Sequence, residues 1–230
     1  MLNTTRKVRE IYENIQRKIF YMIPEKWDEL YLYASVIERF GDVETGELFF
    51  YYIPKGIFRK NPVNVYEVPA KFNLEEAEYL RLVELLYEEI KALRREFKTI
   101  YQEKPWSNLT ISIKNMKFFV EYNYEELQSS EFDSYQRHII WRSKYLNKGI
   151  EKVNKEEREI LERYEDSNEK IHRVETYEEQ IYITDIKNMV DYDTENYESS
   201  QNVEYVSGKN DKKRKNQILM SAEDDEDEPF

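Results

Sequence analysis

The sequence predicts an α+β fold: an antiparallel sheet of about five strands covered by two to three helices, followed by a largely disordered acidic C-terminal tail. Two observations carry this prediction. In the first 149 residues, stretches with apolar side chains at every third or fourth position alternate with stretches that have them at every second position. These spacings are typical of helices and of strands. Beyond residue 149 the chain is strongly acidic and poor in aromatic residues.

Charge divides the chain in two. Residues 1–149 hold 23 acidic and 23 basic side chains, so the whole net charge of −12 belongs to residues 150–230. A chain of about 150 residues can bury roughly 70% of its unfolded surface, which is enough for one core. The second part has the low hydrophobicity and high net charge of a chain that cannot offset its ordering entropy. We therefore expect a domain over 1–149 and an acidic extension over 150–230, mostly disordered apart from a helix over 154–174.

The first half of the domain predicts one helix and three strands. Apolar residues over 5–23 follow the helical spacing, and Pro24 ends that helix. Residues 27–38 alternate and are at least half apolar on both faces, which indicates a central strand. A turn containing two glycines leads into a strand over 48–53, and residues 63–68 predict an edge strand.

The second half of the domain begins with a long helix. Asn73 followed by Glu76 is an N-terminal capping pattern, and the helical spacing then continues to Tyr101. We therefore expect a helix with Asn73 at its N-cap and Tyr101 near its end.

A hairpin and a last helix complete the prediction. Strands over 109–114 and 117–124 are separated by two residues, Asn115 and Met116, which indicates a tight turn. Because methionine is poorly suited to a positive φ, we expect Asn115 to take most of that strain. The last helix is predicted from a cap at Asp133 to Leu146.

Composition excludes several classes of protein. The chain has no cysteine and only two histidines, His138 and His172, which argues against disulfides, thiolate nucleophiles and metal centres. The acidic balance argues against direct binding of nucleic acid. No apolar run approaches the roughly 18 residues of a membrane span, and the N-terminus lacks the apolar core of a signal peptide. We expect a cytoplasmic protein without cofactor, metal or membrane contact.

Catalytic patterns are weak as well. His138 lies in the middle of a predicted helix without a neighbouring Asp, and a structural histidine is the favoured interpretation. The chain has five glycines, none of them in a phosphate-binding loop, and no serine in a nucleophile elbow. Paired glutamates in so charged a chain are more often solvated helix residues than acid–base pairs. The prediction is a protein that is not an enzyme.

One stretch has the character of a binding surface. Between Lys117 and Arg137 there is no basic residue, and acidic and aromatic side chains alternate. Tyrosines anchor interfaces well because they bury a large area at a low entropic cost. The alternative interpretation is that the tyrosines belong to the sheet core and the acids cap the next helix. The candidate binding residues are Glu121, Tyr122, Tyr124, Glu125, Glu126, Glu131, Phe132, Asp133 and Tyr135.

Several segments, taken in order, resemble the YezG-like immunity family. They are MIPEKWDELYLYASV, FFYYIPKG, VPAKFN, KPWSNLTISI, FFVEYNYEEL and YQRHIIWRSKYL, and they span most of residues 8–149. The chain departs from the family at Met116, where the family tends to have glycine, and after Trp141, where the family has a different run of residues. Residues 150–230 have no counterpart in the resemblance.

The resemblance implies a function. Members of that family are cytosolic antitoxins to secreted nuclease toxins of the type VII (LXG-type) pathway, so the expected partner is a cognate nuclease toxin, bound at its C-terminal catalytic domain. Inhibition by occluding the active site and inhibition by deforming the nuclease both stay open, as does the oligomeric state. The alternative function is a non-inhibitory adaptor or targeting chaperone for a secreted partner.

Overall fold

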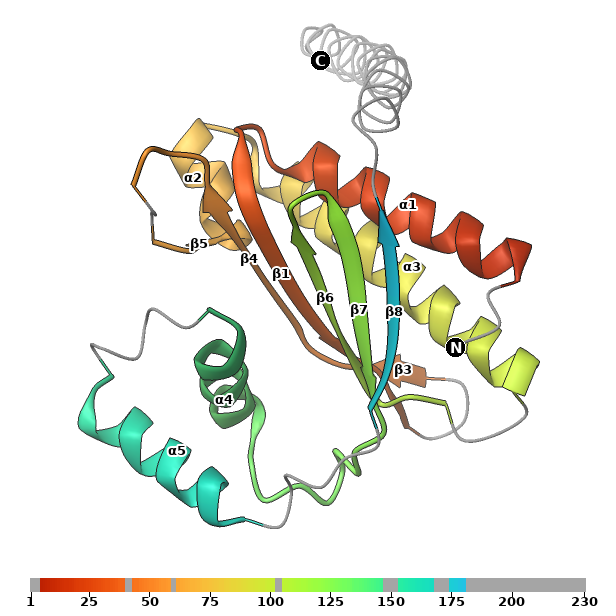
Figure 1. Ribbon diagram of the computed structural model, residues 1–230, viewed down its shortest axis with the longest axis vertical. Helices are drawn as coiled ribbons and strands as arrows, with labels where there is room; N and C mark the ends of the chain where they lie inside the picture. Colours follow the sequence, from red (N-terminus) through yellow and green to blue (C-terminus); the bar gives the residue numbers. More distant parts are fainter. Residues whose placement is uncertain are drawn as a thin grey trace, which may run out of the picture. The chain divides into compact units, whose positions relative to one another are not determined.

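The structure is a computed structural model that describes six stretches of the chain, namely 5–39, 43–58, 61–101, 105–146, 153–167 and 174–180 (Figure 1). All of them belong to one compact unit, Met1–Ile186. A six-stranded antiparallel sheet carries helices on both faces, which confirms the predicted α+β class. Most of the extension that was predicted to be disordered, including 181–230, lies outside the described residues, but residues 174–180 form a strand, which that prediction did not include.

In chain order the elements are α1 (Arg6–Met22), β1 (Trp27–Ser35), β2 (Ile37–Arg39), β3 (Val43–Thr45), β4 (Leu48–Pro54), β5 (Val63–Asn64), the 3-10 helix η1 (Val65–Glu67), α2 (Val68–Phe72), α3 (Glu76–Tyr101), β6 (Asn108–Lys114), β7 (Lys117–Asn123), α4 (Ser134–Leu146), α5 (Lys155–Asp166) and β8 (Val174–Gln180). The strands of the large sheet follow the order β5-β4-β1-β6-β7-β8, and β2 and β3 form a separate two-stranded sheet.

Strand β1 is the centre of the large sheet, as its two apolar faces predict. It pairs antiparallel with β4 on one side and with β6 on the other. Leu30, Leu32 and Ala34 point into the core under α1 and α3, whereas Tyr31 and Tyr33 belong to a second cluster on the opposite face. Alternate residues of β1 therefore contribute to the apolar clusters on both faces of the sheet.

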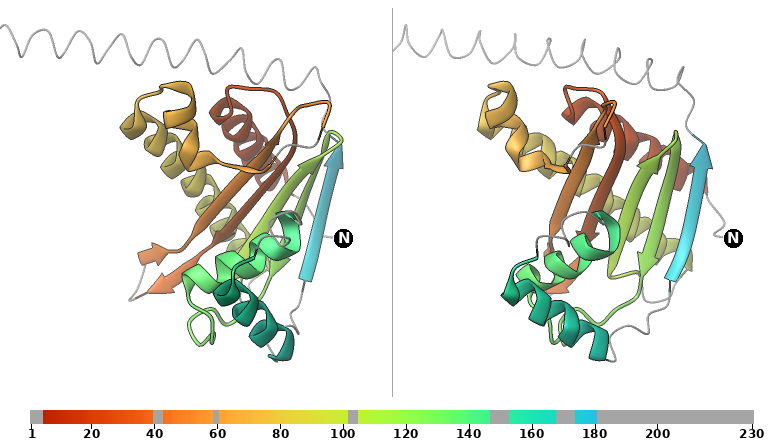
Figure 2. Two further views of the ribbon diagram at one scale, coloured as in Figure 1. Left: turned by 90° about the vertical axis from the view of Figure 1, so that its left-hand side faces the viewer. Right: turned by 60° about the vertical axis from the view of Figure 1, so that its left-hand side comes forward.

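The first layer packs α1 and α3 against one face of the sheet (Figures 1 and 2). Thr5 caps α1 by accepting a hydrogen bond from the backbone N–H of Val8, 3.2 Å away. The apolar stripes of both helices are buried against alternate residues of β1, β6 and β7. The hydroxyls of Tyr12 and Tyr122, deep in this layer, lie 2.5 Å apart and satisfy each other's hydrogen-bonding needs.

The second face of the sheet is covered in part by α4 (Figure 2). Trp141 is buried there beside Tyr33 and Phe49, and its indole N–H donates to the Thr110 hydroxyl at 3.1 Å. Asp133 caps α4 by accepting from the backbone N–H of Gln136 at 2.9 Å, as predicted. One tryptophan thus supplies both the apolar contact and a polar bond that orient the helix on the sheet.

Two elements beyond residue 149 pack on the same unit. Helix α5 begins where it was predicted to begin, with a capping box formed by Asn154 and Glu157, but it ends at Asp166, short of the predicted 174. It packs on α4 through a cluster that includes Ile160. Strand β8 pairs with β7 and extends the sheet by one strand. The division of the chain at residue 149 stays a prediction.

Three local predictions were wrong. The predicted strand over 63–68 has only two strand residues, because the chain turns there into η1 and α2. Asn73 ends α2 in the left-handed conformation with φ 53°, and the side chain of Glu75 accepts the first hydrogen bond of α3 instead, from Glu78 N–H at 2.7 Å. In the hairpin turn, Met116 has φ 61° and Asn115 has φ 49°, so both residues, and not mainly Asn115, adopt the left-handed conformation.

Replacing Trp141 tests the role of the second layer. We expect Trp141→Ala to lower the free energy of unfolding by about 3–5 kcal/mol, because it removes a large buried ring and leaves a cavity between α4 and the sheet. Tyr135→Ala on the same helix is the control, since Tyr135 is exposed and its loss should change stability little. Urea unfolding measures both variants, and equal losses would contradict the assignment.

Candidate partner-binding surface

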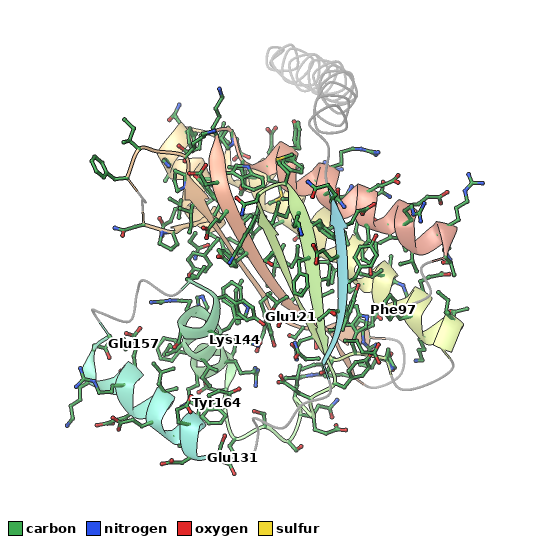
Figure 3. The ribbon with its side chains drawn as sticks, viewed as in Figure 1. Phe97, Glu121, Glu131, Lys144, Glu157 and Tyr164 are labelled. Atoms are coloured by element: carbon green, nitrogen blue, oxygen red, sulfur yellow. The ribbon has the colours of Figure 1, made fainter. Side chains whose placement is uncertain are left out.

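The predicted binding residues fall on three elements. Glu121 and Tyr122 belong to β7, Tyr135 belongs to α4, and the rest lie on the acidic connection, which we define as residues 124–133 between these elements. Figure 3 shows that Glu121 and Glu131 lie apart, the first beside Lys144 and the second near the end of α5. The structure therefore does not gather the predicted set into one patch.

Two of the predicted residues are buried. Tyr122 is 0% exposed and belongs to the core under α1 and α3. Phe132 is 2% exposed and packs edge-on against Tyr164 of α5, with ring centroids 5.6 Å apart. Tyr124 is half-buried and donates to Glu175 of β8 at 3.0 Å. For Tyr122 and Phe132 the structure thus agrees with the alternative interpretation, in which the aromatic residues of this stretch are core.

The exposed members of the set are acidic, with one tyrosine among them. Glu126, Glu131, Asp133 and Tyr135 are exposed, and Glu125 is half-buried. Burial raises the pKa of Tyr33, and the nearby charges of Glu47 and then Glu125 raise it further. The connection starts after Asn123, which pairs with Asn108 beside the end of β1, and it presents its exposed carboxylates to solvent.

Both ends of the acidic connection are fixed. At its end, Arg137 forms an ion pair with Glu47, and its guanidinium also donates to the backbone carbonyl of Phe132. Both partners of the ion pair are largely buried. At its start, the backbone carbonyl of Asn123 accepts from the backbone N–H of Ser107 at 2.9 Å. The carboxylates are thus presented on a backbone whose geometry is set before any partner binds.

A groove that the sequence did not reveal lies on the open part of the second sheet face. It has a volume of about 560 Å³ and is lined from β1, β6, β7, β8, the hairpin turn and the end of α4. Glu121 is the only predicted residue that lines it. No sequence pattern could have found this groove, because its residues come from elements far apart in the chain. The lining residues are Glu29, Tyr31, Ser112, Lys114, Asn115, Lys117, Phe119, Glu121, Lys144, Tyr145 and Glu178.

Charges in the groove are mixed and largely paired. Glu121 accepts from the Tyr145 hydroxyl at 2.5 Å and lies 3.4 Å from the Lys144 ammonium. Lys117 pairs with Glu178 at 2.5 Å. The Lys114 ammonium lies 4.6 Å from the centre of the Tyr31 ring, a cation–π contact. With three lysines and three glutamates, the groove has no net charge to attract a polyanion or a polycation.

His138 is part of the packing between α4 and the sheet. Its ring stacks on Phe49 with centroids 4.3 Å apart, and its Nε2 lies 3.0 Å from the Tyr51 hydroxyl. Burial, reinforced by the positive charge of Arg142, lowers the pKa of His138 to about 4. The ring is therefore neutral at physiological pH and its contacts are those of a structural residue.

Within the six described stretches, no three His, Asp or Glu side chains are grouped so that they could hold a metal ion. No helix in the same stretches is long and apolar enough to cross a membrane.

Comparison with known proteins decides the family. The family model of the YezG-like immunity proteins matches residues 8–162. This chain belongs to the YezG-like immunity protein family. The chain is 32% identical over 166 residues to immunity protein YezG of Bacillus spizizenii, covering 72% of this chain and 97% of the relative. It is 28% identical over 158 residues to immunity protein YezG of Bacillus subtilis, covering 68% and 98%.

A third relative connects the family to secretion. The chain is 29% identical over 146 residues to the type VII secretion system protein EsaG of Staphylococcus aureus, covering 63% of this chain and 83% of the relative. The family and this relative together support an immunity, secretion-associated role. The YezG-like match ends at residue 162, within α5, so strand β8 lies beyond it.

The buried histidine predicts a specific pH dependence. The folded-state pKa of about 4 is below the ordinary 6.5, so the unfolded chain takes up a proton between these values that the folded chain does not. The resulting stability is complete above pH 6.5 and is lost as the pH falls toward 4. Between pH 7.5 and 5.0 we expect the wild type to lose about 1–2 kcal/mol more than His138→Phe, because solvent at the partly exposed ring screens part of the effect. Urea unfolding at both pH values checks this, and parallel losses would contradict it.

Proposed function

We propose that this protein is an immunity protein that binds a cognate secreted nuclease toxin in the cytoplasm and neutralises it by a non-covalent interaction, without catalysis of its own. One observation of the structure carries the proposal. The exposed carboxylates of Glu126, Glu131 and Asp133 lie on a connection that is fixed at both ends and that contains no basic residue. The family and its type VII relative supply the class of partner.

The surface that a nuclease offers to its substrate suits an acidic inhibitor. A nuclease binds phosphates, so its substrate cleft is basic, and a rigid acidic surface competes for that cleft. Glu126, Glu131 and Asp133 have the charge that this competition needs, and Tyr135 beside them adds an exposed aromatic ring. Because the acidic connection is already ordered, little entropy is lost when it docks.

Charge reversal on the acidic connection tests the proposal. We expect Glu126→Lys/Glu131→Lys to abolish protection when the protein is co-expressed with the nuclease encoded beside it, and to slow association at low salt at least tenfold. Both side chains are exposed, so circular dichroism should stay unchanged.

The matched control is Glu84→Lys/Glu88→Lys, which makes the same change in net charge at two exposed positions of α3, on the other face of the sheet. This control should protect as well as the wild type. Unchanged protection by the first variant would move the interface elsewhere, and the absence of any nuclease that the wild type neutralises would refute the function.

An adaptor or targeting chaperone for a secreted partner is the second candidate. The observation that favours it is the name of the Staphylococcus aureus relative, a type VII secretion system protein. An adaptor would bind a non-catalytic region of the partner, whereas an inhibitor would bind the catalytic domain. Mapping the bound fragment of the partner separates the two functions.

We also propose that the binding surface belongs to residues 1–149 and that the extension contributes stability. A chain that ends at Ile186 keeps α5 and β8, and we expect it to neutralise the toxin as the full chain does. A chain that ends at Gly149 exposes the edge of β7 and the apolar residues under Ile160, so we expect a lower melting temperature. Thermal unfolding and co-expression measure both. Loss of protection by the chain ending at Ile186 would place residues 187–230 in the inhibitor.

A further inference from the structure

The most exposed large apolar side chains of the described residues lie side by side in the sequence. Ile57 is 98% exposed and Phe58 is 84% exposed, whereas the next, Val43, is 57% exposed. Ile57 and Phe58 lie on the loop that leaves β4 and leads to β5, which projects from the sheet at the upper left of Figure 1. Isolated exposed apolar residues are common, but two adjacent ones with almost no protein contact at a loop tip are typical of a contact surface.

The base of this loop is firmly held. Ile53 is buried, Pro54 pairs with Trp27 across the sheet, and the backbone N–H of Lys55 donates to the carbonyl of Lys26 at 2.8 Å. Ile57 and Phe58 follow this fixed base within three residues. The chain therefore presents them from an ordered support, which lowers the entropic cost of burying them against a partner.

The charges at the base indicate the chemistry of the partner. Lys26 and Lys55 are both exposed, and neither has an ion-pair partner within the described stretches. An apolar pair with two exposed lysines at the base of its loop fits a pocket that is apolar inside and carries carboxylates at its rim.

Two other occupants fit the structure less well. A second copy of the chain offers the groove on its sheet face, but six of the eleven residues that line it are Lys or Glu. A lipid surface would take up only two apolar side chains, and even one full acyl chain gives only marginal, reversible attachment. In a protein interface, by contrast, a single aromatic residue buried in a pocket is commonly a dominant contact.

The position of the loop adds a second argument. Pro54 lies at the end of the sheet where β1 begins, and the acidic connection starts after Asn123 at the end where β1 finishes. The two surfaces therefore have opposite charge and lie at opposite ends of the strands. Two contacts of opposite sign fix the orientation of a partner, which one acidic patch cannot do.

We propose that Ile57 and Phe58 form an apolar anchor that inserts into an apolar, carboxylate-rimmed pocket of the toxin. This inference rests on the proposed function, and it adds to it a second contact that is independent of the acidic connection. The anchor determines the lifetime of the complex, and the acidic connection determines the rate of its formation.

The test measures binding of full-length variants to the purified, catalytically inactive nuclease encoded beside the gene. We expect Phe58→Ser to raise Kd about 30-fold or more, through faster dissociation, with the salt dependence of the association rate unchanged. Phe58→Leu should keep most of the affinity. Leu85→Ser is the matched control, because Leu85 is an exposed apolar residue of α3, and its Kd should stay within about twofold of the wild type.

Each result decides the matter. A Kd of Phe58→Ser and Ile57→Ser within twofold of the wild type overturns the anchor and leaves the proposed function intact. The anchor is also overturned if these variants bind the nuclease as the wild type does but no longer sediment with phosphatidylglycerol vesicles. The same holds if they bind the nuclease normally but no longer self-associate in analytical ultracentrifugation. If Glu126→Lys/Glu131→Lys loses its salt-dependent association while Phe58→Ser dissociates faster, both surfaces are supported. If the wild type binds no such nuclease, the proposed function and the anchor fail together.

Discussion

The burial of strand β1 on both of its faces is the constraint on which the rest of the structure depends. A strand with apolar residues at odd and even positions needs a layer on each side of its sheet, since an uncovered face would leave tyrosine rings or leucine side chains in water. Helices α1 and α3 cover one face. Helix α4 covers the other in part, through Trp141 and its neighbours. The uncovered remainder of that second face is the groove between α4 and strand β8.

The need for the second layer also shapes the acidic connection. To bring α4 back over Tyr31 and Tyr33, the chain must cross the end of the sheet after β7, and a chain that crosses the end of a sheet is at the surface. The burial of Phe132 and the ion pair of Arg137 with Glu47 fix the backbone of the acidic connection, and its exposed carboxylates face solvent. The ordered acidic surface thus follows from the path that the chain takes to cover β1.

Local patterns predicted most of the architecture because the periods of helices and strands are properties of short segments. The stripe of α1, the cap of α4 at Asp133 and the central place of β1 could all be predicted in this way. Prediction was wrong where two local signals compete. Asn73 suits both the start of one helix and the left-handed end of another, and the structure uses it for the second.

The candidate binding site could be predicted only in outline. The sequence showed a run without basic residues, but the burial of Tyr122 depends on which face of β7 meets α1, and the exposure of Glu126 depends on how the connection after β7 crosses the end of the sheet. Alternation along a strand separates two faces without saying which one becomes core, because that depends on the helices that pack on it. The exposure of Ile57 and Phe58 could not be predicted either, because most apolar residues in the rest of the described chain are buried.

By itself, the sequence determined the class of the fold, the place of β1 and the family resemblance, since these follow from periodicity and from ordered segments along the chain. Tertiary structure alone decided that β8 extends the sheet, that β1, β6, β7, β8 and α4 enclose a groove, and which acidic side chains reach solvent. The physical reason is how far apart in the sequence the interacting residues lie. Helical and strand periods arise between neighbours in the chain, whereas burial and grooves arise between residues that are distant in sequence and meet only after folding.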